Sequence, residues 1–159
     1  MLSFCIPVFK PKPDVFEKHC LSLANQSLKE WEAIFVLDGP SQEARRIISK
    51  TMKGFEFQII EIKHSGAQAA RNEGAKHASG EFLCFFDSDC AIEPGTAKFW
   101  MDTFAKNPDC ALVYSGYKFF GEKYAIEGQP WDPFTLKIRN YISGCFPMRK
   151  EFYPGWTDG

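Results

Sequence analysis

The sequence of 159 residues lacks several patterns that would assign it to a special class of protein. No apolar run approaches the roughly 18 residues of a membrane-spanning helix. The first residues have no basic segment of the kind that opens a secretory signal. There is no G-x-x-x-x-G-K-[ST] phosphate loop, no internal repeat and no low-complexity tract. These absences favour a single globular domain, and its first residues are expected to form a strand.

The chain also has almost no net charge, since 19 basic residues face 20 acidic ones. A surface for nucleic acid or for an anionic membrane is therefore not indicated. None of the six cysteines forms a C-x-x-C or lies at metal spacing from a histidine, which argues against a zinc site and fits a reducing cytosol. With 45% hydrophobic residues and 16 phenylalanines, the chain has ample material for a core.

Strand and helix signals alternate along the chain up to about residue 117. Short apolar runs predict strands at 3–9, 31–37, 55–62, 81–86 and 110–117. Apolar residues spaced three and four apart predict helices at 14–27, 42–52, 66–79 and 94–106. Asp14 and Glu17 are expected to form a capping box, and Gly80 to end the third helix. Four strand–helix units in series predict a parallel sheet in an α/β sandwich.

The helix faces predict which residues enter the core. A stripe of small residues in the third helix would let it approach the sheet closely: Ala67, Ala70, Gly74 and Ala78. In the fourth helix Phe99, Thr103 and Phe104 are expected to face inward. Beyond residue 117 the alternation fails, and we expect a loop at 121–134, a short helix at 136–141, a strand of another kind at 142–148 and a turn at 154–159.

The most informative segment is 81–89, a Phe-rich run that stops on Asp87 and Asp89. A buried, unpaired carboxylate is costly, so two aspartates directly after a buried strand indicate a function rather than packing. Ligands of open parallel sheets bind at the carboxyl ends of the strands. Such a pair could hold a hard divalent cation that carries phosphates. The alternative is a strand-end turn without metal.

Two further features fall at the ends of predicted parallel strands. The first strand ends in Pro7-Val8-Phe9, and the second ends at Asp38. Aspartate is common in turns, so Asp38 taken alone could be a turn former. Because the carboxyl ends of parallel strands meet at one edge of a sheet, we expect all three features to converge on one crevice.

In their order along the chain, these motifs resemble those of the family 2 glycosyltransferases with the GT-A fold. The segments that carry the resemblance are SFCIPVF (3–9), LANQS (23–27), VLDG (36–39), GAQAARNEG (66–74), ASGE (78–81), DSD (87–89), NYISG (140–144) and GWTD (155–158). The resemblance implies a GT-A (Rossmann-like) three-layer sandwich with a mostly parallel central sheet. It implies a single domain over 1–159, with a nucleotide-sugar donor half at 1–117 and the start of an acceptor half at 118–159.

The resemblance implies three residues at the nucleotide base. Pro7 and Phe9 would border the base, and Asp38 would accept a hydrogen bond from its ring N–H, usually that of uracil. It implies three more at the diphosphate and the ribose: Arg71 beside the diphosphate, Asp87 on the ribose or sugar, and Asp89 on Mg²⁺ or Mn²⁺. These roles are chemically sound, because a guanidinium matches diphosphate charge and a hard cation takes carboxylate and phosphate oxygens.

Taken as a helix residue alone, Arg71 could instead be solvated or could pair with Glu73 or Asp87. None of the three histidines matches a ligand or triad spacing. His64 is expected at the surface, where it could also touch a ligand. Cys90 is expected to fill space rather than to react, and Trp131 to line the acceptor site or to close the lip of the pocket.

By resemblance, the protein would be an inverting, metal-dependent glycosyltransferase. It would move a sugar from a nucleotide-diphospho-sugar, usually a UDP-sugar, to a glycan or lipid-linked acceptor. The general base is expected beyond Gly159, so no catalytic residue is assigned, and Asp158 matches the acid of the preceding turn. The chain is therefore expected to be a C-terminally incomplete piece of a longer enzyme. A cytoplasmic location, at the cytosolic face of the membrane, follows from the same resemblance.

Two alternatives remain. The chain could be a nucleotide-sugar-binding module without turnover, because the expected base is missing. It could also be another α/β phosphate enzyme, since haloacid-dehalogenase-like phosphatases use an Asp-x-Asp as well. Their motif lies on the first strand, however, whereas here it follows the fourth.

Overall fold

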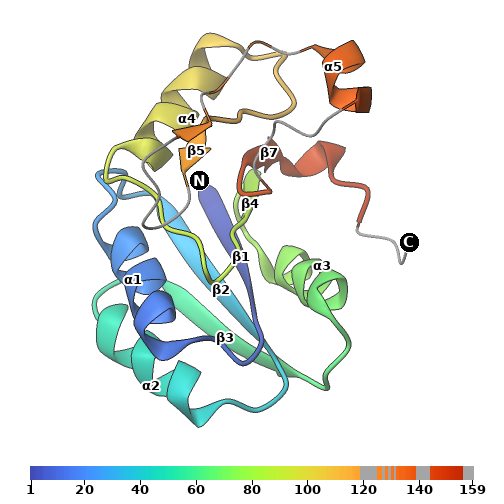
Figure 1. Ribbon diagram of the computed structural model, residues 1–159. Coiled ribbons are helices and arrows are strands. Elements are labelled where there is room, and N and C mark those ends of the chain that lie inside the picture. The colour runs from blue at the N-terminus through green and yellow to red at the C-terminus, as the bar shows by residue number, and fades with distance from the viewer. Residues whose placement is uncertain (119–124, 127, 129, 131, 139–143, 156–159) are drawn as a thin grey trace.

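A central five-stranded sheet organises the computed structural model (Figure 1), which describes residues 1–118, 125–126, 128, 130, 132–138 and 144–155. Its strand order is β3-β2-β1-β4-β7. The strands are β1 (Leu2–Val8), β2 (Trp31–Asp38), β3 (Phe57–Ile62), β4 (Phe82–Phe85) and β7 (Pro147–Arg149). The first four are parallel, and β7 pairs antiparallel with β4. The predicted mostly parallel sheet is confirmed.

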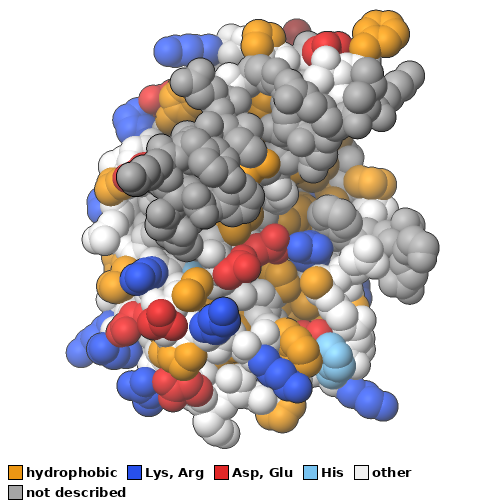
Figure 2. All heavy atoms as spheres, in the orientation of Figure 1, with side chains coloured by type: hydrophobic (Ala, Val, Ile, Leu, Met, Phe, Trp, Pro, Cys, Tyr) orange, Lys and Arg blue, Asp and Glu red, His pale blue; other side chains and the backbone are white. Residues whose placement is uncertain are grey.

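Helices cover both faces of this sheet and complete three layers (Figure 1). On one face lie α1 (Pro13–Ala24), α2 (Gln42–Thr51) and α4 (Thr96–Lys106), and on the other lies α3 (Ala67–His77). Smaller elements are β5 (Tyr117–Lys118), β6 (Ala125–Ile126), α5 (Pro133–Ile138) and the 3₁₀ turn η1 (Lys150–Phe152). In the described part of the chain, no helix is long and apolar enough to cross a membrane. Acidic and basic side chains intermingle on the face drawn in Figure 2.

Strands β1 and β2 are buried along their whole length, as expected for strands covered on two faces. Helix α3 approaches them closely through Ala70 and Gly74, which are buried. A Cβ atom added at Gly74 would lie 3.1 Å from the Cβ of Cys5. The expected small-residue contact is therefore confirmed, except that Ala67 is exposed at the start of the helix.

Two expected helix signals are wrong. Helix α1 begins at Pro13, one residue before the expected cap, because proline suits the first helical position. Lys12 is the N-cap and makes no side-chain cap, so the Asp14–Glu17 capping box does not form. Helix α3 ends at His77, and Gly80 serves a close approach instead. A Cβ atom at Gly80 would lie 2.6 Å from the Met1 carbonyl oxygen.

The strand expected at 110–117 is also wrong in most of its length. This segment contacts β7 through an isolated bridge from Leu112 to Met148. Residues 117–118 belong to the separate β5–β6 pair. The position next to β4 is occupied by β7, so 110–117 cannot pair there. The expected strand at 142–148 overlaps β7, although 142–143 lie outside the described residues. Helix α5 begins at Pro133 rather than at 136, because the Asp132 side chain accepts from the Phe134 N–H at 2.9 Å.

Candidate functional site

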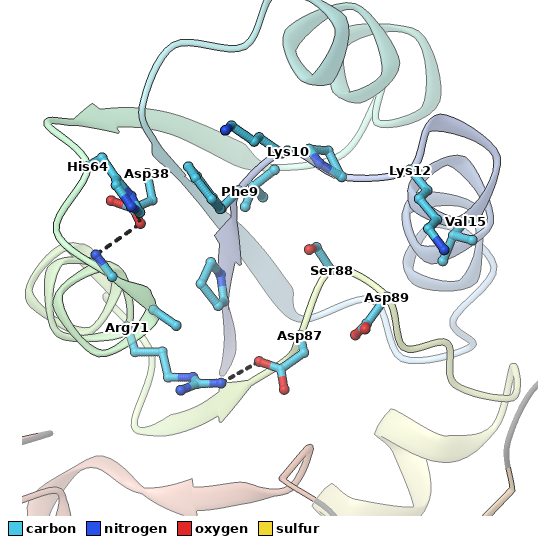
Figure 3. A pocket seen from close by; sticks show the side chains of 15 residues that line it. Phe9, Lys10, Lys12, Val15, Asp38, His64, Arg71, Asp87, Ser88 and Asp89 are labelled. Atoms are coloured by element: carbon cyan, nitrogen blue, oxygen red, sulfur yellow. Dashed lines mark hydrogen bonds and ion pairs between the residues drawn. The ribbon is translucent and has the colours of Figure 1, made fainter. Parts of the chain in front are cut away.

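A pocket of about 720 Å³ lies at the carboxyl ends of β1, β2 and β4 (Figure 3). All six residues to which the sequence analysis gave a role line it: Pro7, Phe9, Asp38, Arg71, Asp87 and Asp89. They come from the ends of three neighbouring parallel strands and from the first turns of α3. The expected convergence on one crevice is therefore confirmed. The role of each residue stays a prediction.

Asp38, the last residue of β2, holds the turn that leads into α3. Its Oδ1 accepts from the Ser65 N–H at 2.7 Å, and its Oδ2 accepts from the Gly66 N–H at 3.0 Å and from His64 Nδ1 at 2.8 Å. Burial alone would raise the pKa of Asp38, but these donors outweigh it and hold the pKa below its ordinary value. Asp38 is therefore an ionised, buried acceptor at the pocket wall.

The His64 ring lines the pocket and stacks on Phe9. The ring centroids are 4.2 Å apart and the planes differ by 7°. Since the ionised carboxylate of Asp38 can only accept, His64 carries its proton on Nδ1 and is fixed by that bond. Because His64 matches no metal or triad spacing, the sequence predicts for it only a surface position, from which it could also touch a ligand. Its position after β3, at the same edge of the sheet, is the signal that could have identified it.

Arg71 of α3 forms an ion pair with Asp87, with 2.6 Å between Nη2 and Oδ1. The sequence left Glu73 and Asp87 open as partners of Arg71. In the structure Arg71 pairs with Asp87, whereas Glu73 pairs with Lys76 and His77. The side chains of Arg71 and Asp87 are 19% and 37% exposed, so this pair forms part of the pocket wall rather than a solvated surface bridge. Such an arrangement fixes both side chains before a ligand arrives.

Asp89 lies in a tight turn after β4 that the Cys90 N–H closes by donating to the Asp87 carbonyl at 2.9 Å. Asp89 is exposed to the pocket. Among the described residues, no group of three or more potential ligands could hold a metal alone. The hard carboxylate of Asp89 nevertheless suits a divalent ion whose other ligands are phosphate and water oxygens. The donor set therefore fits Mg²⁺ or Mn²⁺ that arrives with a diphosphate.

Cys90 does not have the properties of a reactive thiol. A hydrogen bond with the Cys145 thiol, together with burial, raises the pKa of Cys90 well above its usual range. The thiol therefore stays protonated, in keeping with the expected space-filling role. Trp131 and Asp158, which the sequence analysis also discussed, lie outside the described residues.

Two lysines that the sequence analysis missed line the pocket as well. Lys10 and Lys12 come from the loop between β1 and α1 (Figure 3). Lys10 has a φ of 43°, a left-handed conformation that is uncommon for a residue other than glycine. Together with Arg71 they bring three cationic side chains to the pocket. The site thus offers both cationic side chains and carboxylates, as an anionic ligand accompanied by a cation requires.

Comparisons with known proteins agree with this geometry. The family model for glycosyl transferase family 2 matches residues 3–154. TuaG of Bacillus subtilis, provisionally named a teichuronic acid biosynthesis glycosyltransferase, is 26% identical over 159 residues, which covers 93% of this chain and 61% of TuaG.

Two solved structures share the fold. S. aureus TarS in complex with UDP-GlcNAc has a TM-score of 0.72 at 22% identity and covers 94% of this chain and 45% of its own. The mannosyltransferase PcManGT from Pyrobaculum calidifontis, in complex with GDP-Man and Mn²⁺, has a TM-score of 0.73 at 14% identity and covers 98% and 47%. The chain thus spans less than two thirds of the length of each of these proteins.

Proposed function

The chain belongs to glycosyl transferase family 2, and on that premise we propose that its pocket binds a nucleotide-diphospho-sugar, most commonly a UDP-sugar, for transfer of the sugar. The observation that carries the proposal is the meeting of Asp38, Arg71 and Asp89 in one pocket of about 720 Å³. That volume lies in the range of small-molecule sites. TarS with UDP-GlcNAc and PcManGT with GDP-Man, both similar in fold, support the class of ligand.

The nucleotide base would lie at the end of the pocket that holds Phe9, Pro7 and Asp38. The aromatic surface of Phe9 offers an apolar wall for a flat ring. Asp38 Oδ1 accepts only one of the bonds described above, so one of its lone pairs remains for the imide N–H of uracil. Its depressed pKa keeps the carboxylate ionised, which strengthens such a bond.

The diphosphate would lie between the Asp87–Asp89 turn and the loop that joins β1 to α1 and carries Lys10 and Lys12. Lys10, Lys12 and Arg71 would offset its charge, and Asp87 would orient Arg71 and reach the ribose or sugar. Asp89 would hold Mg²⁺ or Mn²⁺ together with phosphate oxygens. When bound, this ion supplies Lewis-acid stabilisation of the charge on the departing nucleoside diphosphate.

The remaining features of the reaction follow from the family resemblance alone. They are transfer with inversion, a glycan or lipid-linked acceptor, and action at the cytosolic face of a membrane. Residues 1–117 would form the donor half and 118–159 the start of the acceptor half. A base that deprotonates the acceptor is not assigned to any residue of this chain.

A second candidate is a nucleotide-sugar-binding module without turnover. It is favoured because each pocket residue with a proposed role would bind the donor, and no residue is assigned as the base. The release of UDP from UDP-GlcNAc, measured with this chain, separates the two candidates. Binding without release would favour the binding module, whereas release that depends on Asp89 would favour the enzyme.

Calorimetric titration with UDP, GDP and ADP tests the base assignment. We expect UDP to bind most tightly, and Asp38→Asn to weaken it by about tenfold, because an amide replaces the ionised acceptor. Glu43→Gln, the same chemical change on the exposed face of α2, is the matched control and should leave the affinity unchanged. Equal affinities of wild type and Asp38→Asn would reject the proposed base contact.

A further inference from the structure

Helix α1 and the segment directly after it turn polar side chains toward the segment that follows β4. Ser22 Oγ accepts from the Ile92 N–H at 3.3 Å. Gln26 is 1% exposed; its Nε2 donates to the Glu93 carbonyl at 2.9 Å, and its Oε1 accepts from the Ala97 N–H at 3.0 Å. The path of the chain from the end of β4 to the start of α4 is therefore fixed by side chains of α1 and of the segment directly after it.

Another polar side chain of α1, His19, reaches the Asp87–Asp89 turn that is proposed to bind the metal. Its Nδ1 lies 2.9 Å from the carbonyl oxygen of Cys90. A carbonyl can only accept, so Nδ1 carries the proton and donates. The ring is fully buried, stacks on Phe16 at 5.7 Å and lies 4.5 Å from the Phe86 ring. His19 therefore has no freedom to move away from its partner.

The contact acts on the backbone that carries Asp89. Cys90 closes the turn with its N–H, which donates to the Asp87 carbonyl, and its own carbonyl receives the His19 proton. At the other end of the turn, the Asp87 side chain is held by Arg71 of α3. The turn is thus held between helices on opposite faces of the sheet, with Asp89 between the two attachments.

The chemistry of the buried ring shows what the imidazole contributes at this position. Burial lowers the pKa of His19 to about 4, against the opposing effects of the Cys90 carbonyl, the Asp89 charge and the Asp87 carbonyl. Its Nε2 is buried and has no hydrogen-bond partner in the described structure, which carries a desolvation cost. A phenyl ring would fill the same space without that cost. The bond that Nδ1 donates is a property that a phenyl ring could not supply.

We propose that His19 is a positioning residue for the metal-binding turn. By donating to the Cys90 carbonyl, it fixes the backbone on which Asp89 presents its carboxylate to a divalent ion. The inference rests on the proposed function, in which Asp89 binds the ion that accompanies a nucleoside diphosphate. His19 itself touches neither ion nor nucleotide.

Two variants separate the donor from the ring. His19→Phe keeps an aromatic ring in the core but removes the donor. His19→Asn carries an amide N–H close to the position of Nδ1 and can restore the bond. Ile48→Val is the control, because it alters the same core cluster from α2 without removing a ring that packs on His19.

Binding of Mn²⁺ in the presence of UDP can be followed by the loss of the electron paramagnetic resonance signal of the free ion. We expect His19→Phe to weaken Mn²⁺ binding by about tenfold, the scale of one hydrogen bond. His19→Asn should recover most of that loss, and Ile48→Val should match the wild type. Binding of UDP without metal should be the same in all four proteins. A merely structural role would instead weaken both ligands in every variant in proportion to its loss of stability.

The outcomes are distinguishable. Wild-type affinity for Mn²⁺ in folded His19→Phe overturns the inference while leaving the proposed function intact. A wild-type protein that binds no Mn²⁺ with UDP overturns the proposed function and the inference with it. Should His19→Phe not fold, nitrogen NMR of the wild-type imidazole decides. A proton on Nδ1 that exchanges slowly with water supports the inference, and a proton on Nε2 overturns it.

Discussion

Acidification should weaken the fold through His19, whose pKa in the folded protein is about 4 against an ordinary value of 6.5. Between these two values the unfolded chain binds a proton that the folded chain excludes. The contribution of His19 is therefore fully present above pH 6.5 and is lost as the pH falls toward 4. At about 1.4 kcal/mol for each pH unit across this interval, the loss amounts to about 3 kcal/mol.

A loss of this size is measurable, because domains of this size are stable by only about 5–15 kcal/mol. The assay is urea unfolding of the wild type and of His19→Phe at a series of pH values from neutral down to about 4. Asp38 and Glu32, whose pKa values are also lowered, lose stability on acidification in both proteins and cancel in the difference. Relative to the wild type, His19→Phe should therefore gain about 3 kcal/mol over this range. Stability curves that run parallel for the two proteins would show that burial of His19 does not make the fold sensitive to acid.

Three other substitutions test further contacts. Gly80→Ala should destabilise the fold by about 1–3 kcal/mol, because the added Cβ would lie 2.6 Å from the Met1 carbonyl oxygen. Gly95→Ala is the control, since a Cβ there would have nothing within 4 Å. Thermal unfolding measures both variants. Glu32→Gln should cost about 1–3 kcal/mol at neutral pH, since the buried carboxylate accepts three bonds at 2.7 Å. Because its pKa is lowered, that cost should vanish as the pH falls through the folded pKa, below 4.5. Arg71→Ala should weaken UDP about tenfold, and unchanged calorimetric affinity would remove it from the diphosphate site.

The parallel sheet and the composition of the pocket could be predicted because both depend on local patterns. Each central strand is a short apolar run, and each ends in a residue that apolar packing does not explain. Parallel geometry then brings the ends together, which is why Phe9, Asp38 and Asp87 meet although 29 and 49 positions of chain separate them.

Other features could not be predicted because they depend on distant partners. The apolar run at 110–117 carries no sign that β7 occupies the place beside β4. In α4 the expected inward residue Phe99 is 57% exposed, and its neighbour Trp100 is buried instead, since two adjacent aromatic residues leave the face ambiguous. His19 escaped notice because its partner is a backbone carbonyl 71 positions away, and backbone partners leave no trace in the sequence.

The proposed function depends on the Asp87–Asp89 turn joining a divalent ion to a nucleoside diphosphate in this pocket. Calorimetry of UDP binding with and without Mn²⁺, for the wild type and Asp89→Ala, tests it most directly. We expect Mn²⁺ to tighten UDP binding in the wild type and this gain to be lost in Asp89→Ala. Binding that is indifferent both to the metal and to the substitution would rule out a metal site at this turn.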